Sequence, residues 1–136
     1  METYLSNRFN DIVYNPETSI LYHIHKPDTA EMVEEDFKSM LIKWRETVLK
    51  VQPQSVLIDA LEMNFPMSPE LQVWITDEVT VPIFTRTQLQ KMCFVMPEEF
   101  VSKLSLDQYR DASDKVVEDK SINYVSTRDM AEEWLR

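Results

Sequence analysis

Alternating apolar and polar residues near the start of the chain predict two β-strands, at residues 9–14 and 19–25. Asn15 and Pro16 between them suit a type I turn. The second strand has two different faces, one with Ile20, Tyr22 and Ile24 and the other with Leu21, His23 and His25. We therefore expect an antiparallel hairpin that carries both histidines on its polar side.

Apolar residues spaced three and four apart predict a long helix from Asp28 to about Lys50. Asp28 and Glu31 have the spacing of a capping box, with Asp in place of the usual Ser or Thr. The expected apolar stripe consists of Val33, Phe37, Met40, Leu41, Trp44 and Val48.

A continuous apolar run at residues 56–58 predicts a strand that is covered on both faces and ends at Asp59. After a loop, Ser68 is a good N-cap and Pro69 suits the first position of a helix. Pro82 should kink or end this helix, so we expect an irregular or restarted segment around residues 79–84. Sites in open α/β sheets lie beyond the carboxyl ends of strands, so a site is expected at this loop.

The remaining chain predicts strands at residues 91–96 and 122–125. We expect helices at residues 97–104, 105–116 and 126–135. Strands that alternate with helices indicate a largely parallel sheet. The prediction is one α/β domain over residues 1–136: a mixed, mostly parallel five-stranded sheet, about four flanking helices, an N-terminal β-hairpin, and loosely ordered residues 1–8.

Charge and composition narrow the classes of function. The formal net charge of -10 argues against nucleic-acid binding and against docking on anionic membranes. The absence of glycine excludes Gly-rich phosphate loops and the nucleophile elbow of α/β-hydrolases. Cys93 lies in an apolar run and is expected to be a buried thiol. With no leader-like segment and no run long enough for membrane insertion, we expect a cytoplasmic protein.

The order of elements resembles the STAS (SpoIIAA-like) domain family, especially its bacterial branch grouped with CRAL-TRIO-like domains. The resemblance covers nearly the whole chain from about Phe9. The matching stretches are Tyr14-Asn15-Pro16-Glu17, Val56-Leu57-Ile58-Asp59, Ser68-Pro69-Glu70-Leu71-Gln72-Val73-Trp74-Ile75, Pro82, Phe94-Val95-Met96-Pro97 and Ala131-Glu132-Glu133-Trp134-Leu135.

The resemblance implies a regulatory or binding module without catalysis. In anti-sigma-factor antagonists of this family, a Ser at the start of the helix after the central strand is phosphorylated and switches partner binding. Ser68 occupies the comparable place here, so it is a candidate phosphosite. The chain departs from the family's Asp-Ser-Ser-Gly-like run, because residues 64–67 precede Ser68 and Pro69 follows it.

Two groups of residues surround the expected site. Asp59, Glu62 and Asn64 are candidates for its rim. An apolar pocket, or an exposed patch for a partner, is expected from Met63, Phe65, Met67, Trp74 and Phe84, with Val81 and Ile83 beside them in the case of a patch. The alternative is that the apolar loop folds over the top of the core.

The sequence contains few residues that suit a metal site or acid–base catalysis. The side chains of His23 and His25 point to the same face of the strand, but a metal site needs a third ligand. The candidates for that ligand are Asp59 and Cys93. The carboxylates of Asp59, Glu62 and Glu70 are expected to cap the loop or face solvent. We therefore predict no metal, no cofactor and no catalytic residues.

Three functions follow, in order of preference. The first is a cytoplasmic regulatory or protein-interaction module that self-associates, as a homodimer. The second is a small-molecule or lipid-binding domain, and the third is a metal-dependent enzyme. Partner binding predicts surface patches without a pocket, ligand binding predicts a closed apolar cavity, and an enzyme predicts a polar cleft with converging ionisable groups.

Overall fold

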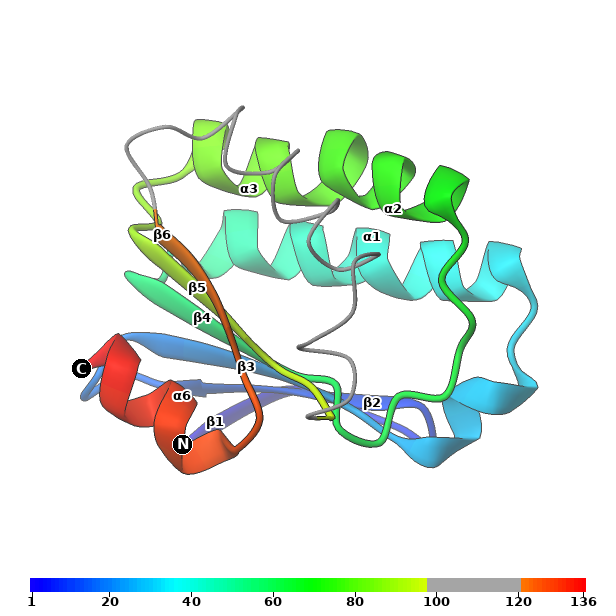
Figure 1. Ribbon diagram of the computed structural model, residues 1–136. Coiled ribbons are helices and arrows are strands. Elements are labelled where there is room, and N and C mark those ends of the chain that lie inside the picture. Colours follow the sequence, from blue (N-terminus) through cyan, green and yellow to red (C-terminus); the bar gives the residue numbers. More distant parts are fainter. Residues whose placement is uncertain (98–120) are drawn as a thin grey trace.

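The computed structural model describes residues 1–97 and 121–136, which form an α/β fold around one six-stranded sheet (Figure 1). The strands lie in the sheet in their chain order: β1 (Glu2–Ser6), β2 (Asn10–Asn15), β3 (Ile20–His25), β4 (Ser55–Asp59), β5 (Lys91–Val95) and β6 (Ser121–Val125). The first two pairings are antiparallel, and those of β3 with β4, β4 with β5 and β5 with β6 are parallel. The carboxyl ends of four strands therefore meet at one edge.

Helices cover both faces of the sheet (Figure 1). One face packs against α1 (Glu34–Val51) and a second helical stretch, which comprises α2 (Pro69–Ile75), a π-helical turn η2 (Thr76–Thr80) and α3 (Val81–Arg86). The other face packs against α6 (Arg128–Leu135). Within the described residues two apolar cores result, a larger one under α1 and α2 and a smaller one against α6.

The predicted five strands were one too few. Residues 2–6, expected in a loosely ordered N-terminus, form β1 and pair with β2 at the edge of the sheet. Most of β1 is exposed, so its sequence lacks the alternation of a half-buried strand. Backbone hydrogen bonds to β2 hold the strand in place, and a pattern of apolar residues cannot predict such bonds.

The predicted start of the first long helix was also wrong. Residues Pro27–Glu31 form a separate 3₁₀ turn, η1, and α1 begins only at Glu34. No capping box forms, because Asp28 lies inside the 3₁₀ turn; Asp28 and Glu31 both pair with Arg8. Val33, expected in the apolar stripe, precedes the helix and is 61% exposed.

The irregular segment expected near Pro82 is present. The chain widens into the π-helical turn η2 and restarts as α3, with Pro82 in its first turn. A proline lacks the N–H that an α-helix needs at this point, so the change of helical pitch accommodates it. The predicted helices at 97–104 and 105–116 lie outside the described residues.

The prediction that His23 and His25 lie on a polar side was wrong. Their face of β3 packs under α1 in the larger core, and both side chains are buried. The error arose because β3 is an interior strand, paired on both sides and covered on both faces. In the described part of the chain, every helix is too short or too polar to traverse a lipid bilayer.

Candidate functional site

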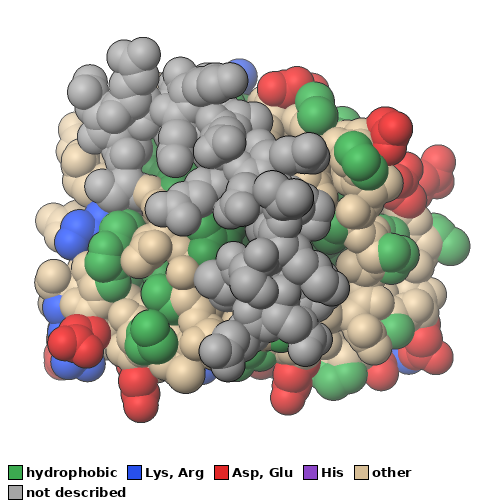
Figure 2. Space-filling model, viewed as in Figure 1, with side chains coloured by type: hydrophobic (Ala, Val, Ile, Leu, Met, Phe, Trp, Pro, Cys, Tyr) green, Lys and Arg blue, Asp and Glu red, His purple; other side chains and the backbone are tan. Residues whose placement is uncertain are grey.

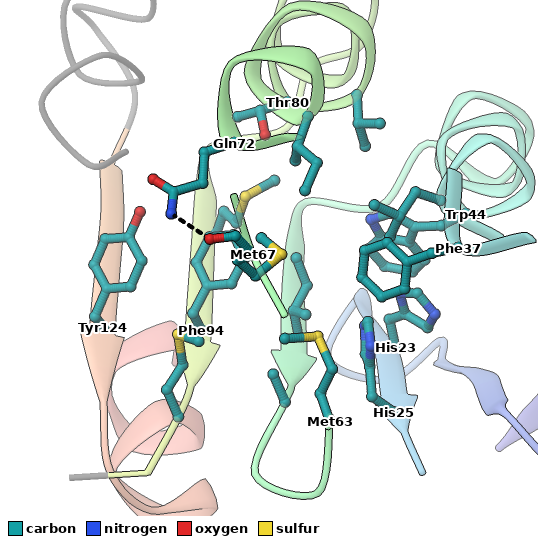
Figure 3. A pocket seen from close by; sticks show the side chains of 17 residues that line it. His23, His25, Phe37, Trp44, Met63, Met67, Gln72, Thr80, Phe94 and Tyr124 are labelled. Carbon is teal, nitrogen blue, oxygen red and sulfur yellow. Dashed lines mark hydrogen bonds between the residues drawn. The ribbon is translucent and has the colours of Figure 1, made fainter. Parts of the chain in front are cut away.

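A cavity of about 70 Å³ lies in the larger core, between the sheet and the helices α1 and α2 (Figure 3). Almost all of its lining is apolar. The lining residues are His23, His25, Phe37, Leu41, Trp44, Ile58, Ala60, Met63, Met67, Gln72, Ile75, Val79, Thr80, Met92, Phe94, Met96 and Tyr124. Close-packed interiors seldom leave such a space, so the cavity is the main candidate for a binding site.

The loop after β4 forms one wall of the cavity. The backbone N–H of Ala60 donates to the carbonyl of Val95 (2.8 Å), and that of Met63 donates to Ala60 (3.2 Å). The N–H of Asn64 donates to Oγ1 of the buried Thr29 (3.0 Å). These bonds fix a loop that has no regular secondary structure and aim Met63 and Met67 inward (Figure 3).

Aromatic stacking fixes the same loop from outside the cavity. The ring of Phe65 lies parallel to that of Phe37 on α1, with 4.4 Å between centroids. Phe37 lines the cavity, so Phe65 supports the wall without belonging to it.

The start of α2 contributes a second wall. Ser68 is its N-cap, as predicted, and its hydroxyl accepts from the N–H of Leu71 (3.1 Å). One turn later, the amide of Gln72 donates to the carbonyl of Met67 (3.4 Å) and lies near Tyr124 in Figure 3. The polar side chains of Gln72, Thr80 and Tyr124 thus occur among the apolar lining on this side.

The two histidines lie on the opposite side, in an aromatic cluster (Figure 3). The ring of His23 stacks on Trp44 (4.7 Å between centroids) and meets that of His25 at 4.3 Å. Nε2 of His23 lies 2.9 Å from Nδ2 of the buried Asn10. With that amide nitrogen as donor, Nε2 accepts and the ring proton resides on Nδ1.

Burial keeps both imidazoles neutral. It lowers the pKa of His25 to about 4, and burial together with the neighbouring His25 holds the pKa of His23 well below its ordinary value. Within the described residues, neither nitrogen of His25 has a hydrogen-bond partner, and the same holds for Nδ1 of His23 and Nε1 of Trp44. Orphaned polar atoms in a buried position are uncommon, and these belong to three side chains that line one cavity.

The predicted rim residues lie away from this cavity. Asp59 is on the opposite face of the sheet from Ile58, and its carboxylate caps the loop by accepting from the N–H of Leu61 (3.2 Å). Glu62 and Asn64 are exposed. None of the three is among the cavity residues in the described chain.

Of the five predicted apolar residues, the structure brings Met63 and Met67 to the cavity. Phe65 lies behind Phe37, and Trp74 is half-buried beneath Lys38, whose ammonium lies 5.0 Å from the ring centroid. Phe84 is buried in the core outside the lining.

No candidate metal centre forms in residues 1–97 and 121–136, where no three His, Cys, Asp or Glu side chains converge. Both suggested partners of the histidines, Asp59 and Cys93, lie across the sheet from them. Cys93 is fully buried, as predicted, and burial raises the pKa of its thiol to about 12.

On the face shown in Figure 2, hydrophobic side chains are visible at several places, and acidic side chains lie around its edge. In the described chain, the large exposed hydrophobic residues are Met1, Tyr4, Val33, Leu61, Val73 and Met130. They come from five different parts of the chain, and none is among the five residues predicted for an apolar patch.

The sequence assigns several cavity residues to ordinary core positions. Phe37 and Trp44 belong to the predicted apolar stripe of a helix, and Met92, Phe94 and Met96 belong to the predicted strand at residues 91–96. One signal was available: Leu21, His23 and His25 share a face of a strand that precedes a helix with a strong apolar stripe. A helix in that position can cover either face of the strand, so this signal alone does not place the histidines under it.

A scan of family models found no match to the chain, and the searches of curated proteins and of solved structures found no significant one. The function therefore has to be argued from the cavity itself.

Proposed function

We propose that this protein is a binding module for a small, largely apolar molecule held in the cavity between α1, α2 and the sheet. The observation that carries the proposal is a cavity of about 70 Å³ in the core, lined almost wholly by apolar side chains. An apolar molecule that fills the cavity would gain dispersion contacts with these side chains.

The side chains that line the cavity can adjust to the shape of a ligand. Met63, Met67, Met92 and Met96 all contribute to it. Methionine side chains are unbranched and polarizable, so they adjust to the shape of a ligand more readily than β-branched side chains do. Two of the four lie on the loop after β4, which could admit a ligand by moving.

The STAS-like regulatory module, with Ser68 as its phosphosite, remains a second proposal. It rests on the order of elements and on the position of Ser68 at the start of α2. We place it second because it does not explain the cavity.

The test begins with native mass spectrometry of protein purified from its own cells, followed by a denaturing run of the same sample. We expect extra mass that is lost on denaturation. A bare protein would contradict the binding proposal, whereas an added phosphate that survives denaturation and maps to Ser68 would favour the regulatory one.

Two matched variants locate the bound molecule. Ala60→Val adds two methyl groups at the cavity, and Ala131→Val makes the same change in the smaller core against α6. Ala60→Val should lose the extra mass and stay folded, because the added atoms fill empty space. Ala131→Val should keep it, although overpacking there costs about 1–3 kcal/mol. Equal occupancy in both variants would place the ligand elsewhere.

A further inference from the structure

The side chains that line the cavity indicate the chemistry of its ligand. This inference rests on the proposed function. Among the described residues, side chains on its histidine side carry four buried nitrogen atoms that lack partners: Nδ1 and Nε2 of His25, Nδ1 of His23 and Nε1 of Trp44. All three side chains line the cavity, and none is more than 3% exposed. A ligand with a suitable polar group would satisfy atoms that are costly to leave unpaired.

Charge excludes ionic ligands. In the described part of the lining there is no Asp, Glu, Lys or Arg. The imidazoles are neutral near pH 7, because burial lowers their pKa values. A charged group that entered this cavity would lose its hydration without gaining a counterion, which is strongly unfavourable.

Hydrogen-bond complementarity then selects the polar group. The neutral ring of His25 offers one donor and one acceptor, while Trp44 offers a donor only. With Asn10 donating to Nε2 of His23, Nδ1 of His23 is a further donor. A hydroxyl group both donates and accepts, so it can give its proton to His25 and accept from a neighbouring N–H.

The volume and the lining of the cavity limit the apolar part of the ligand. The cavity is about half the volume of an engineered 150 Å³ cavity that binds benzene. Aromatic side chains contribute from both sides, Phe37 and Trp44 from α1, and Phe94 and Tyr124 from the sheet. A single aromatic ring is larger than this space, so Met63 and Met67 must shift to admit one, and any larger rigid body is excluded.

We propose that the ligand is a small, uncharged phenol whose hydroxyl group hydrogen-bonds to His25 while its ring lies among the aromatic and methionine side chains. His25 is thereby a specificity-determining residue, which distinguishes a hydroxylated ring from a bare one.

The experiment titrates phenol, toluene and benzoate separately into ¹⁵N-labelled full-length protein at pH 7. The readout is the indole N–H resonance of Trp44, identified by its loss in Trp44→Phe. We expect phenol to bind at least about tenfold more tightly than toluene, the effect of one net hydrogen bond. Benzoate should bind more weakly than phenol by a similar factor, because its carboxylate is charged.

Two variants of one residue test the role of His25. His25→Leu is similar in size but has neither donor nor acceptor, so phenol and toluene should bind it equally. His25→Gln keeps one donor and one acceptor, so it should retain the preference for phenol. Circular dichroism checks the fold of each variant; if His25→Leu does not fold, the wild-type preference and its retention in His25→Gln decide.

The outcomes separate the two proposals. Equal binding of phenol and toluene to the wild type, with a shift at Trp44, would overturn hydroxyl recognition and leave the apolar binding site standing. No shift at Trp44 with either ring compound would overturn both. A preference for phenol that persists in His25→Leu would overturn the assignment of His25.

Discussion

At the scale of single residues, Ser68 shows how one hydroxyl fixes the start of a helix. Its Oγ accepts from the N–H of Leu71, a donor that has no partner inside the helix. Replacing Ser68 with Ala should therefore lower the free energy of unfolding by about 1 kcal/mol, measured by urea denaturation.

The matched control is Ser68→Asp, since Asp caps helices about as well as Ser does and its charge suits a helix N-terminus. We expect it to be as stable as the wild type. Equal stability of Ser68→Ala and Ser68→Asp would show that the cap contributes nothing.

Cys93 gives a second prediction at this scale. Its thiol is fully buried, and burial raises its pKa to about 12, so the native protein holds almost no thiolate at pH 8. The thiol should react with a disulfide reagent only on unfolding. Reaction of the folded protein as fast as of the urea-unfolded protein would contradict this burial.

At the scale of elements, the helical stretch after the loop is completed by a side chain from another helix. In an α-helix the carbonyl of Glu78 would accept from the N–H of residue 82, but Pro82 has none. Nη1 of Arg45 on α1 donates to that carbonyl instead (2.9 Å). Arg45 thus links the two helices above the cavity.

We expect Arg45→Ala to destabilise the protein by about 1–2 kcal/mol, since a bond from a charged donor is lost. In a Pro82→Ala background the restored N–H can reach Glu78, so the same substitution should cost less. A double-mutant cycle by urea denaturation measures the difference. The control is Lys43→Ala, an exposed change on the same helix, which should cost little in either background. Equal costs of Arg45→Ala in both backgrounds would refute the link.

Elements buried on a defined face were predictable from the sequence. The strand at residues 56–58, the cap at Ser68 and the irregularity near Pro82 all follow from local chemistry. The exposed strand β1 was missed because backbone pairing leaves no apolar pattern. The start of α1 was misplaced because the two acids that resembled a capping box lie in a separate 3₁₀ turn, where both pair with Arg8.

At the scale of the whole molecule, the sequence predicted the loop that borders the cavity, but it did not predict the opposite wall of the cavity. Met63 and Met67 were expected near the carboxyl end of β4, and they line it. The opposite side depends on which face of β3 lies under α1, which is decided by tertiary packing. Two histidines that were predicted on a polar side are therefore buried polar groups of the site, His23 at 0% and His25 at 3% exposed.

That burial makes the stability of the whole fold dependent on pH. Below about pH 6.5 the histidines of the unfolded chain bind protons, whereas burial keeps His25 neutral in the folded state down to about pH 4. The unfolded state then binds more protons, so the free energy of unfolding falls as the pH drops from 6.5 towards 4. Each buried histidine contributes about 1.4 kcal/mol per pH unit within this window.

Urea denaturation at pH 7, 6 and 5 measures this loss directly. His25→Leu removes one titrating group, so its stability should decline less steeply than that of the wild type, by about 1.4 kcal/mol per pH unit between pH 6 and 5. Ile24→Val, on the opposite face of β3, should lower stability equally at every pH, because it removes apolar contact without changing proton binding. Parallel curves for the wild type and His25→Leu would mean that His25 is already protonated, and hence solvated, in the folded protein. A cavity with a charged, solvated imidazole would not select a neutral ligand, so the same measurement tests the basis of the binding proposal.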